Sequence, residues 1–258
     1  SDTAAGSLTI QGASDDETLS YTQSTSDSTR GVLAVGSLLP IEFNNKASIG
    51  FAGGGGHDIV NLGNPTTPTG FSGGVTISGV APDTDNSLQV PIHADTNGTA
   101  DTLVVRPGAT AYGGTLTGLA NYSTITLTNV SDLQLTGTAG TDKFSFAGTT
   151  STDDLIYTTT SGNNSIGVIT GTTASGAKAV IPTTLIGISP SLADGLMINN
   201  VSGTTGGVDT LTFIAAGSLS DTFSFSSTSP LTIIDTVGGS TFATVIAPNF
   251  NGGITFNG

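Results

Sequence analysis

Short segments in which apolar and polar residues alternate recur along the whole chain. They include LTI from Leu8, VTI from Val75, LQL from Leu133, FSF from Phe144 and ITF from Ile254. A period of two residues is typical of β-strands with one buried face, and Thr, Val, Ile and Phe favour strands. Only Ser189–Met197 (SPSLADGLM) has a start signal for one or two helical turns. The pattern predicts an all-β protein.

The segment Leu133–Phe146 (LQLTGTAGTDKFSF) contains the repeat in its clearest form. Two alternating segments flank a Gly-containing bend, and an Asp precedes the second segment. Looser copies lie at Leu8–Tyr21, Ile49–Leu62, Val75–Val90 and Leu196–Phe213. Because a pair of short strands cannot bury a face alone, stacked copies would share a continuous apolar row. The repeat predicts a β-solenoid, similar to a parallel β-helix, with irregular rungs. One or two β-sandwich domains are the alternative.

The repeat indicates how the chain is divided. Residues 1–258 are predicted to form a single elongated β-repeat domain, because copies of the repeat occur along the whole sequence. The Gly/Ser/Thr-rich stretch Ser161–Ala177 is predicted to be a loop and the place of any soft division. In the bends, Gly would supply positive φ angles and Asp would accept hydrogen bonds from turn N–H groups.

Composition narrows the range of partners. Only 9% of the residues are charged, the formal net charge is -14, and there is no Cys. Such a surface repels nucleic acid and anionic lipid, so neither is an expected partner. No apolar run approaches the roughly 18 residues of a membrane helix, so membrane insertion is not expected. An acidic surface would attract divalent cations or a basic partner.

The segment Ile125–Phe146 resembles a β repeat found in very large secreted surface proteins of planctomycetes and related bacteria. The shared pattern is a strand, a turn, a second strand, a Gly-rich bend and an Asp-Thr-apolar strand. Its last step recurs at Asp101-Thr102-Leu103, Asp209-Thr210-Leu211 and Asp221-Thr222-Phe223. The resemblance implies an extracellular, cell-surface or matrix role without enzymatic activity. Full copies are few, and long insertions separate them.

A second segment, Gly53–Val60 (GGGGHDIV), resembles the calcium-binding nonapeptide of secreted RTX proteins. That resemblance implies a calcium site at Gly53, Gly55 and Asp58, with Asp142 in a partial match further along the chain. The family uses tandem copies, whereas a single full copy occurs here. The alternative is a Gly-rich bend in which Asp58 accepts backbone hydrogen bonds.

Three functions follow as hypotheses. The first is a structural subunit of an extracellular filament or surface layer that self-assembles through β edges, with copies of itself as partners. The second is an adhesin or calcium-stabilised binding module of a larger surface protein, with cell-surface glycans as partners. The third is a β-helix carbohydrate-active enzyme that uses the acids at Asp15–Glu17, Asp83 and Asp85, or Asp153 and Asp154. The chain lacks Trp, and His57 and His93 match no known ligand spacing, so no enzyme activity is expected.

Overall fold

A computed structural model describes residues 6–63, 68–93, 101–119, 122–137, 142–160, 163–173, 177–187, 196–199, 209–214, 221–225, 232–237, 240–246 and 253–257. For residues 160, 163–165, 199, 221–225, 232–237 and 240–246, the structure describes the backbone only. Every regular element in these ranges is a β-strand, as the alternation predicts. These residues include no helix that is long and apolar enough to span a membrane.

The strands form two large mixed sheets. Sheet A contains, in spatial order, β1 (Ser7–Gln11), β5 (Ser48–Ala52), β7 (Val75–Ser78), β11 (Ile125–Thr128), β10 (Gly114–Thr117), β9 (Thr102–Pro107), β13 (Lys143–Ala147), β18 (Leu196–Asn199), β22 (Ser240–Ile246), β21 (Thr232–Val237) and β20 (Asp221–Phe225). Sheet B contains β23 (Gly253–Asn257), β19 (Thr210–Ile214), β14 (Asp154–Thr160), β15 (Asn163–Thr173), β17 (Thr183–Ile186), β12 (Asp132–Thr136), β8 (Asn86–His93), β6 (Gly56–Leu62), β2 (Thr18–Gln23), β3 (Gly31–Val35) and β4 (Ile41–Phe43). The short β16 (Lys178–Ala179) pairs with β15 beside this order.

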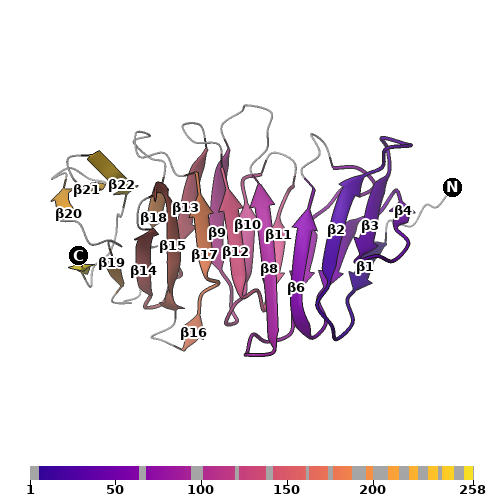
Figure 1. The fold of residues 1–258 in the computed structure, drawn as a ribbon, viewed down its shortest axis with the longest axis horizontal. Coiled ribbons are helices and arrows are strands. Elements are labelled where there is room, and N and C mark those ends of the chain that lie inside the picture. Colours follow the sequence, from indigo (N-terminus) through magenta and orange to yellow (C-terminus); the bar gives the residue numbers. More distant parts are fainter. Residues whose placement is uncertain are drawn as a thin grey trace.

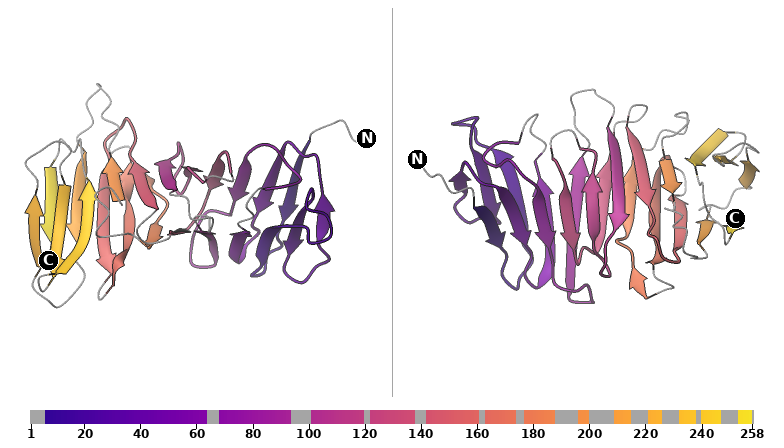
Figure 2. Two further views of the ribbon diagram at one scale, coloured as in Figure 1. Left: turned by 90° about the horizontal axis from the view of Figure 1, so that it is seen from above. Right: turned by 180° about the vertical axis from the view of Figure 1, so that it is seen from behind.

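The two strands of each sequence repeat lie in opposite sheets. In Leu8–Tyr21, for example, β1 belongs to sheet A and β2 to sheet B, and the bend between them crosses from one sheet to the other. Each strand then pairs in parallel with a strand of a later repeat, β1 with β5 and β2 with β6. The chain thus advances along the longest axis of the molecule, from indigo to yellow in the views of Figures 1 and 2.

Antiparallel meanders of three strands interrupt this advance. In the described residues they are β2–β3–β4 and β14–β15–β17 in sheet B, and β9–β10–β11 and β20–β21–β22 in sheet A. Three antiparallel strands end in the direction in which they began. Consequently, β9–β10–β11 and β14–β15–β17 fit between parallel strands without reversing the direction of the sheet, and β2–β3–β4 and β20–β21–β22 end their sheets in the same direction.

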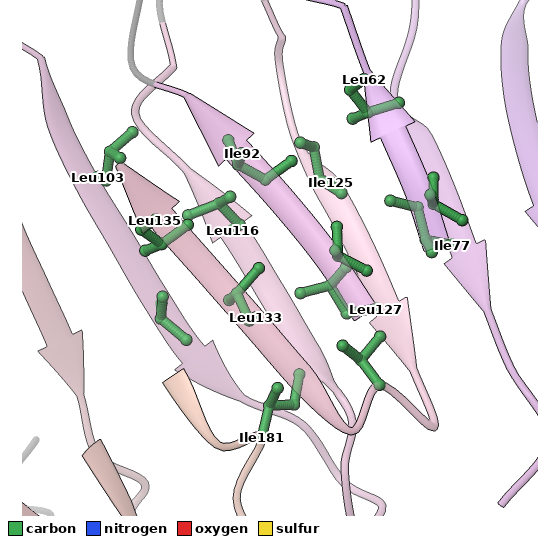
Figure 3. Packing of buried hydrophobic residues seen from close by; sticks show 14 of the residues in the cluster. Leu62, Ile77, Ile92, Leu103, Leu116, Ile125, Leu127, Leu133, Leu135 and Ile181 are labelled. Carbon is green, nitrogen blue, oxygen red and sulfur yellow. The ribbon is translucent and has the colours of Figure 1, made fainter. Parts of the chain in front are cut away.

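Apolar side chains pair with apolar side chains along each sheet. In sheet A, Phe144 lies in register with Leu103 on one side and with Leu196 on the other. In sheet B, Phe213 pairs with Tyr157 and Phe256. One hydrophobic core contains residues of both sheets, and Figure 3 shows its middle, where Leu133 and Leu135 of β12 lie near Leu103 and Leu116. Burial of these rows supplies the main force that holds the two sheets together.

Two local predictions have different outcomes. The predicted loop at Ser161–Ala177 is wrong, because Asn163–Thr173 forms β15, which pairs with β14 and β17 on its two sides. Neighbouring strands on both sides satisfy its backbone, and Ile169 is buried, which outweighs the weak strand preference of its Gly residues. Of the predicted helical turn, Leu196 and Met197 lie in β18, and Ser189–Gly195 fall outside the described residues.

Candidate functional site

The Asp residues of the repeat bind backbone of the neighbouring strand. Asp58 is buried, and its Oδ1 accepts a hydrogen bond of 3.0 Å from the N–H of Glu17. In return, the N–H of Ile59 donates to the carbonyl of Glu17 over 2.9 Å. Near the start of β6, the carboxylate of Asp58 therefore accepts the hydrogen bond that a backbone carbonyl would accept in a regular strand pair.

The same pair of hydrogen bonds recurs in both sheets. The N–H of Asp101 donates to Oδ1 of buried Asp142 over 3.0 Å, and the N–H of Asp153 donates to Oδ1 of buried Asp209 over 2.9 Å. Ser131 has this role before β12, where its Oγ accepts from the N–H of Leu88 over 2.9 Å. The sequence predicts the acceptor role correctly, and the donors come both from the same bend and from the neighbouring strand. Asp58 accepts from the N–H of Gly54 as well as from that of Glu17, and Asp153 accepts from the N–H of Thr149 in its own bend.

Glycine makes room for these carboxylates. A Cβ atom on Gly53 would lie 2.7 Å from Oδ2 of Asp58, and one on Gly137 would lie 3.0 Å from Cβ of Asp142. In both bends the Gly precedes the Asp by five positions, and the same spacing separates Gly12 from Glu17. This Gly-x4-acid spacing recurs in three of the repeat copies, and the close contacts explain why Gly stands before Asp58 and Asp142.

The predicted calcium ligands fall in two separate bends, with Gly53 beside Asp58 in one and Asp142 in the other. Asp58 lies in β6 of sheet B, whereas Asp142 directly precedes β13 of sheet A. Among the described residues, no group of three or more His, Cys, Asp or Glu side chains could hold a metal ion. Burial raises the pKa of Asp58, which disfavours the charged form that calcium binds, although the Glu17 N–H partly offsets it. Calcium at Gly53, Gly55 and Asp58, and at Asp142, stays a prediction.

A shallow hollow lies on sheet B, with a volume of about 320 Å³. Its lining comes from β6, β8 and the start of β12: His57, Asp58, Ile59, Ser87, Gln89, Ser131 and Asp132. The Asp132 carboxylate accepts hydrogen bonds of 2.9 Å from the side-chain amides of Gln89 and Gln134. Beside the hollow, the N–H of His57 donates to Oδ1 of Asp16 over 2.8 Å, and this bond lowers the pKa of Asp16. Carboxamide and carboxylate groups of this kind can bind hydroxyl groups.

The ends of the two sheets form the other candidate site. In the described residues, sheet A ends in β1 and β20, and sheet B ends in β4 and β23. Next to β4, the turn from β3 exposes Leu38 by 68% and Leu39 by 91%, and Ile41 in β4 is 49% exposed. At the opposite end, Ile254 and Phe256 of β23 are only partly buried against the core. Unpaired edges next to exposed apolar side chains are typical of interaction surfaces.

Comparison with known proteins adds no relative. No family model, no curated protein and no solved structure matches the chain. The hollow and the sheet ends are therefore the features of the molecule that bear on its function.

Proposed function

We propose that the protein is a structural subunit of an extracellular filament or surface layer, and that its copies assemble through the edges of their sheets. The observation that carries the proposal is the pair of edge strands at each end of the described fold, β1 with β4 and β20 with β23. Edge strands present unpaired N–H and C=O groups, and another strand satisfies them best. The exposed Leu38, Leu39 and Ile41 add apolar area that association would bury.

The fold in this proposal is a β-solenoid with irregular rungs. The parallel pairing of β1 with β5 and of β5 with β7, with intervening strands in sheet B, supports it. A solenoid leaves its terminal rungs open unless they are capped, and a subunit that is stacked on its neighbours needs open rungs. Localisation at the cell surface is part of the same proposal, as is the absence of catalysis.

The test is the oligomeric state of the purified chain. We expect its mass in light scattering to rise with concentration, and electron microscopy to show filaments or sheets. A mass that stays monomeric at high concentration, together with micrographs that show no polymer, would contradict the proposed function.

The hollow on sheet B supports a second candidate, an adhesin that binds neutral glycans of the cell surface. The carboxylate of Asp132 would accept hydrogen bonds from sugar hydroxyls, and the side-chain amide of Gln89 would donate to them. Titration of neutral oligosaccharides, followed by NMR chemical shifts, would perturb the signals of Gln89 and Gln134 first. Asp132→Ala should abolish those shifts and Asp85→Ala should not. Absence of any shift at millimolar sugar would reject this candidate.

A further inference from the structure

The chain contains a structural repeat that is longer than the short strand–bend–strand unit. When Leu8 is placed on Phe144, the segment Gly12…Glu17-x-Leu19-x-Tyr21 falls on Gly148…Asp153-x-Leu155-x-Tyr157, because each pair of positions is 136 residues apart. The strands agree as well: β1 and the meander β2–β3–β4 correspond to β13 and the meander β14–β15–β17. The meander β9–β10–β11 followed by β12 likewise corresponds to β20–β21–β22 followed by β23.

The two halves of the chain meet at a joint that uses both sheets. We call it the internal joint: β9 pairs in parallel with β13 in sheet A, and β12 pairs in parallel with β17 in sheet B. By the correspondence of the halves, β20 and β23 are the counterparts of β9 and β12. In the same way, β1 and β4 are the counterparts of β13 and β17. Each end of the molecule thus repeats one side of the internal joint.

We propose that copies of this chain stack head to tail through a repetition of the internal joint, with β20 pairing to β1 and β23 pairing to β4 of the next copy. This inference rests on the proposed function and specifies its interface. Strand direction permits it, because every meander has three strands. As a result, β1 and β20 run in the same direction within sheet A, and β4 and β23 run in the same direction within sheet B. Such a contact is heterologous and repeats by translation, so it produces an open filament.

The two ends also have complementary steps. At one end of the described fold, β3 and β4 of sheet B extend two strands beyond β2, the sheet B strand that follows β1 in the chain. At the other end, β21 and β20 of sheet A extend two strands beyond β22, the sheet A strand that precedes β23. Each extension fills the gap opposite the other. A second copy is the partner that this geometry fits, because it offers two edges with the required direction and offset.

Exposed residues at the free end correspond to buried residues at the internal joint. The β3–β4 connection ends in Leu38-Leu39-Pro40, and the connection that leads to β17 ends in Val180-Ile181-Pro182. The two prolines directly precede corresponding strands: Gly31 pairs with Phe43 of β4, as Gly167 pairs with Leu185 of β17. Val180 and Ile181 are each 2% exposed, whereas Leu38 and Leu39 are 68% and 91% exposed.

The internal joint predicts the register between copies. Leu133 and Leu135 of β12 pair with Thr183 and Leu185, so Ile254 and Phe256 should pair with Ile41 and Phe43 of the next copy. The carbonyl of Pro182 accepts from the N–H of Leu133 over 2.9 Å at the internal joint. The carbonyl of Pro40 should accept from Ile254 in the same way. On the outer face, Thr255 should then lie opposite Glu42 of the next copy.

Cross-linking of single-cysteine variants tests this register, because the natural chain has no Cys. Thr255→Cys and Glu42→Cys are prepared separately, mixed, and treated with a short bismaleimide. We expect a band at twice the subunit mass in the mixture and none with either variant alone. A mixture of Thr255→Cys with Thr126→Cys, which is exposed in the middle of sheet A, is the matched control. Thr222→Cys with Ser7→Cys probes the sheet A side independently if Glu42→Cys does not fold.

The possible outcomes distinguish a failure of the head-to-tail joint from a failure of the proposed function. If polymers form but both mixed pairs fail to cross-link, or if one variant alone forms the dimer, the head-to-tail joint is wrong and assembly stands. If the protein is monomeric and neither mixed pair cross-links, both the proposed function and the head-to-tail joint are wrong.

Discussion

The residue pairs Val180-Ile181 and Leu38-Leu39 occupy corresponding places in the two halves of the molecule, yet one pair is buried and the other is exposed. Both pairs precede a proline and the last strand of a sheet B meander. The difference lies in the neighbours. The carbonyl of Ala179 accepts from the N–H of Tyr112, and a Cβ on Gly114 would lie 3.6 Å from Cδ1 of Ile181. The preceding half therefore covers the inner pair.

The comparison shows that local sequence sets which residues are apolar, and that stacking sets which of them become buried. A single three-strand meander leaves its connection exposed until another meander lies against it.

The largest effect is expected from an acidic side chain at the paired apolar positions. Ile181→Asp places an unpaired charge in the core and should lower the free energy of unfolding by about 3–5 kcal/mol, as measured by urea titration with circular dichroism. Leu39→Asp should change that free energy by less than about 0.5 kcal/mol and abolish polymer formation in light scattering. Val80→Asp, at an exposed apolar residue in a different bend, is the control. Equal losses of stability at positions 39 and 181 would contradict the assigned burial.

The hydrogen bond at the internal joint predicts a smaller effect. Asp142→Ala leaves the N–H of Asp101 without its acceptor and should lower the free energy of unfolding by about 1–3 kcal/mol. Asp142→Asn keeps an acceptor oxygen and should be milder. Gly6 takes the corresponding place at the free end, so Gly6→Asp would supply an acceptor for Asp221 of the preceding copy. It should lower the concentration at which polymer appears in light scattering, and a rise in that concentration would count against the joint.

Asp58 predicts a pH dependence. Burial raises its pKa in the folded state above the unfolded value, so the folded state binds the proton more tightly. The stabilisation that Asp58 contributes is therefore fully present below its pKa in the unfolded state. It is lost as the pH rises through the raised pKa of the folded state. Compared with Asp58→Asn, which does not titrate, the natural protein should gain stability as pH falls toward 4. Urea titrations of both proteins at several pH values measure this, and an opposite slope would show that the folded state favours the charged carboxylate.

The smallest effect is expected from a chelator. Because the Asp58 carboxylate already accepts the N–H of Glu17, EDTA should leave the melting temperature unchanged within the error of a thermal scan. Magnesium-saturated EDTA controls for ionic strength. A fall of tens of degrees, reversed by added calcium, would instead establish the calcium-stabilised module.

Much of the local structure follows from the sequence alone. Alternation identifies β1, β12 and β13, and the Gly-x4-acid spacing identifies the bends in which Asp58 and Asp142 bind neighbouring backbone. β15 could not be predicted, because Gly167 and Gly171 weaken its pattern and its pairing partners are supplied by the rest of sheet B.

The sheet ends were harder to locate from the sequence. Leu38 and Leu39 resemble core residues, and only the fold reveals that the described residues leave them exposed. A signal for the internal joint was nevertheless present, in the 136-residue spacing between Gly12…Tyr21 and Gly148…Tyr157. Short alternating repeats of similar composition hide this longer period.

The axial repeat of the assembled filament tests the head-to-tail joint most directly. In the described fold, the pairing order of each sheet contains eleven strands. At about 4.8 Å between neighbouring strands, translation by one subunit should measure about 53 Å along the filament. Helical reconstruction by cryo-electron microscopy should therefore give a polar filament with that rise per subunit. A filament with two-fold axes between subunits, or with a rise unrelated to the strand count, would contradict it.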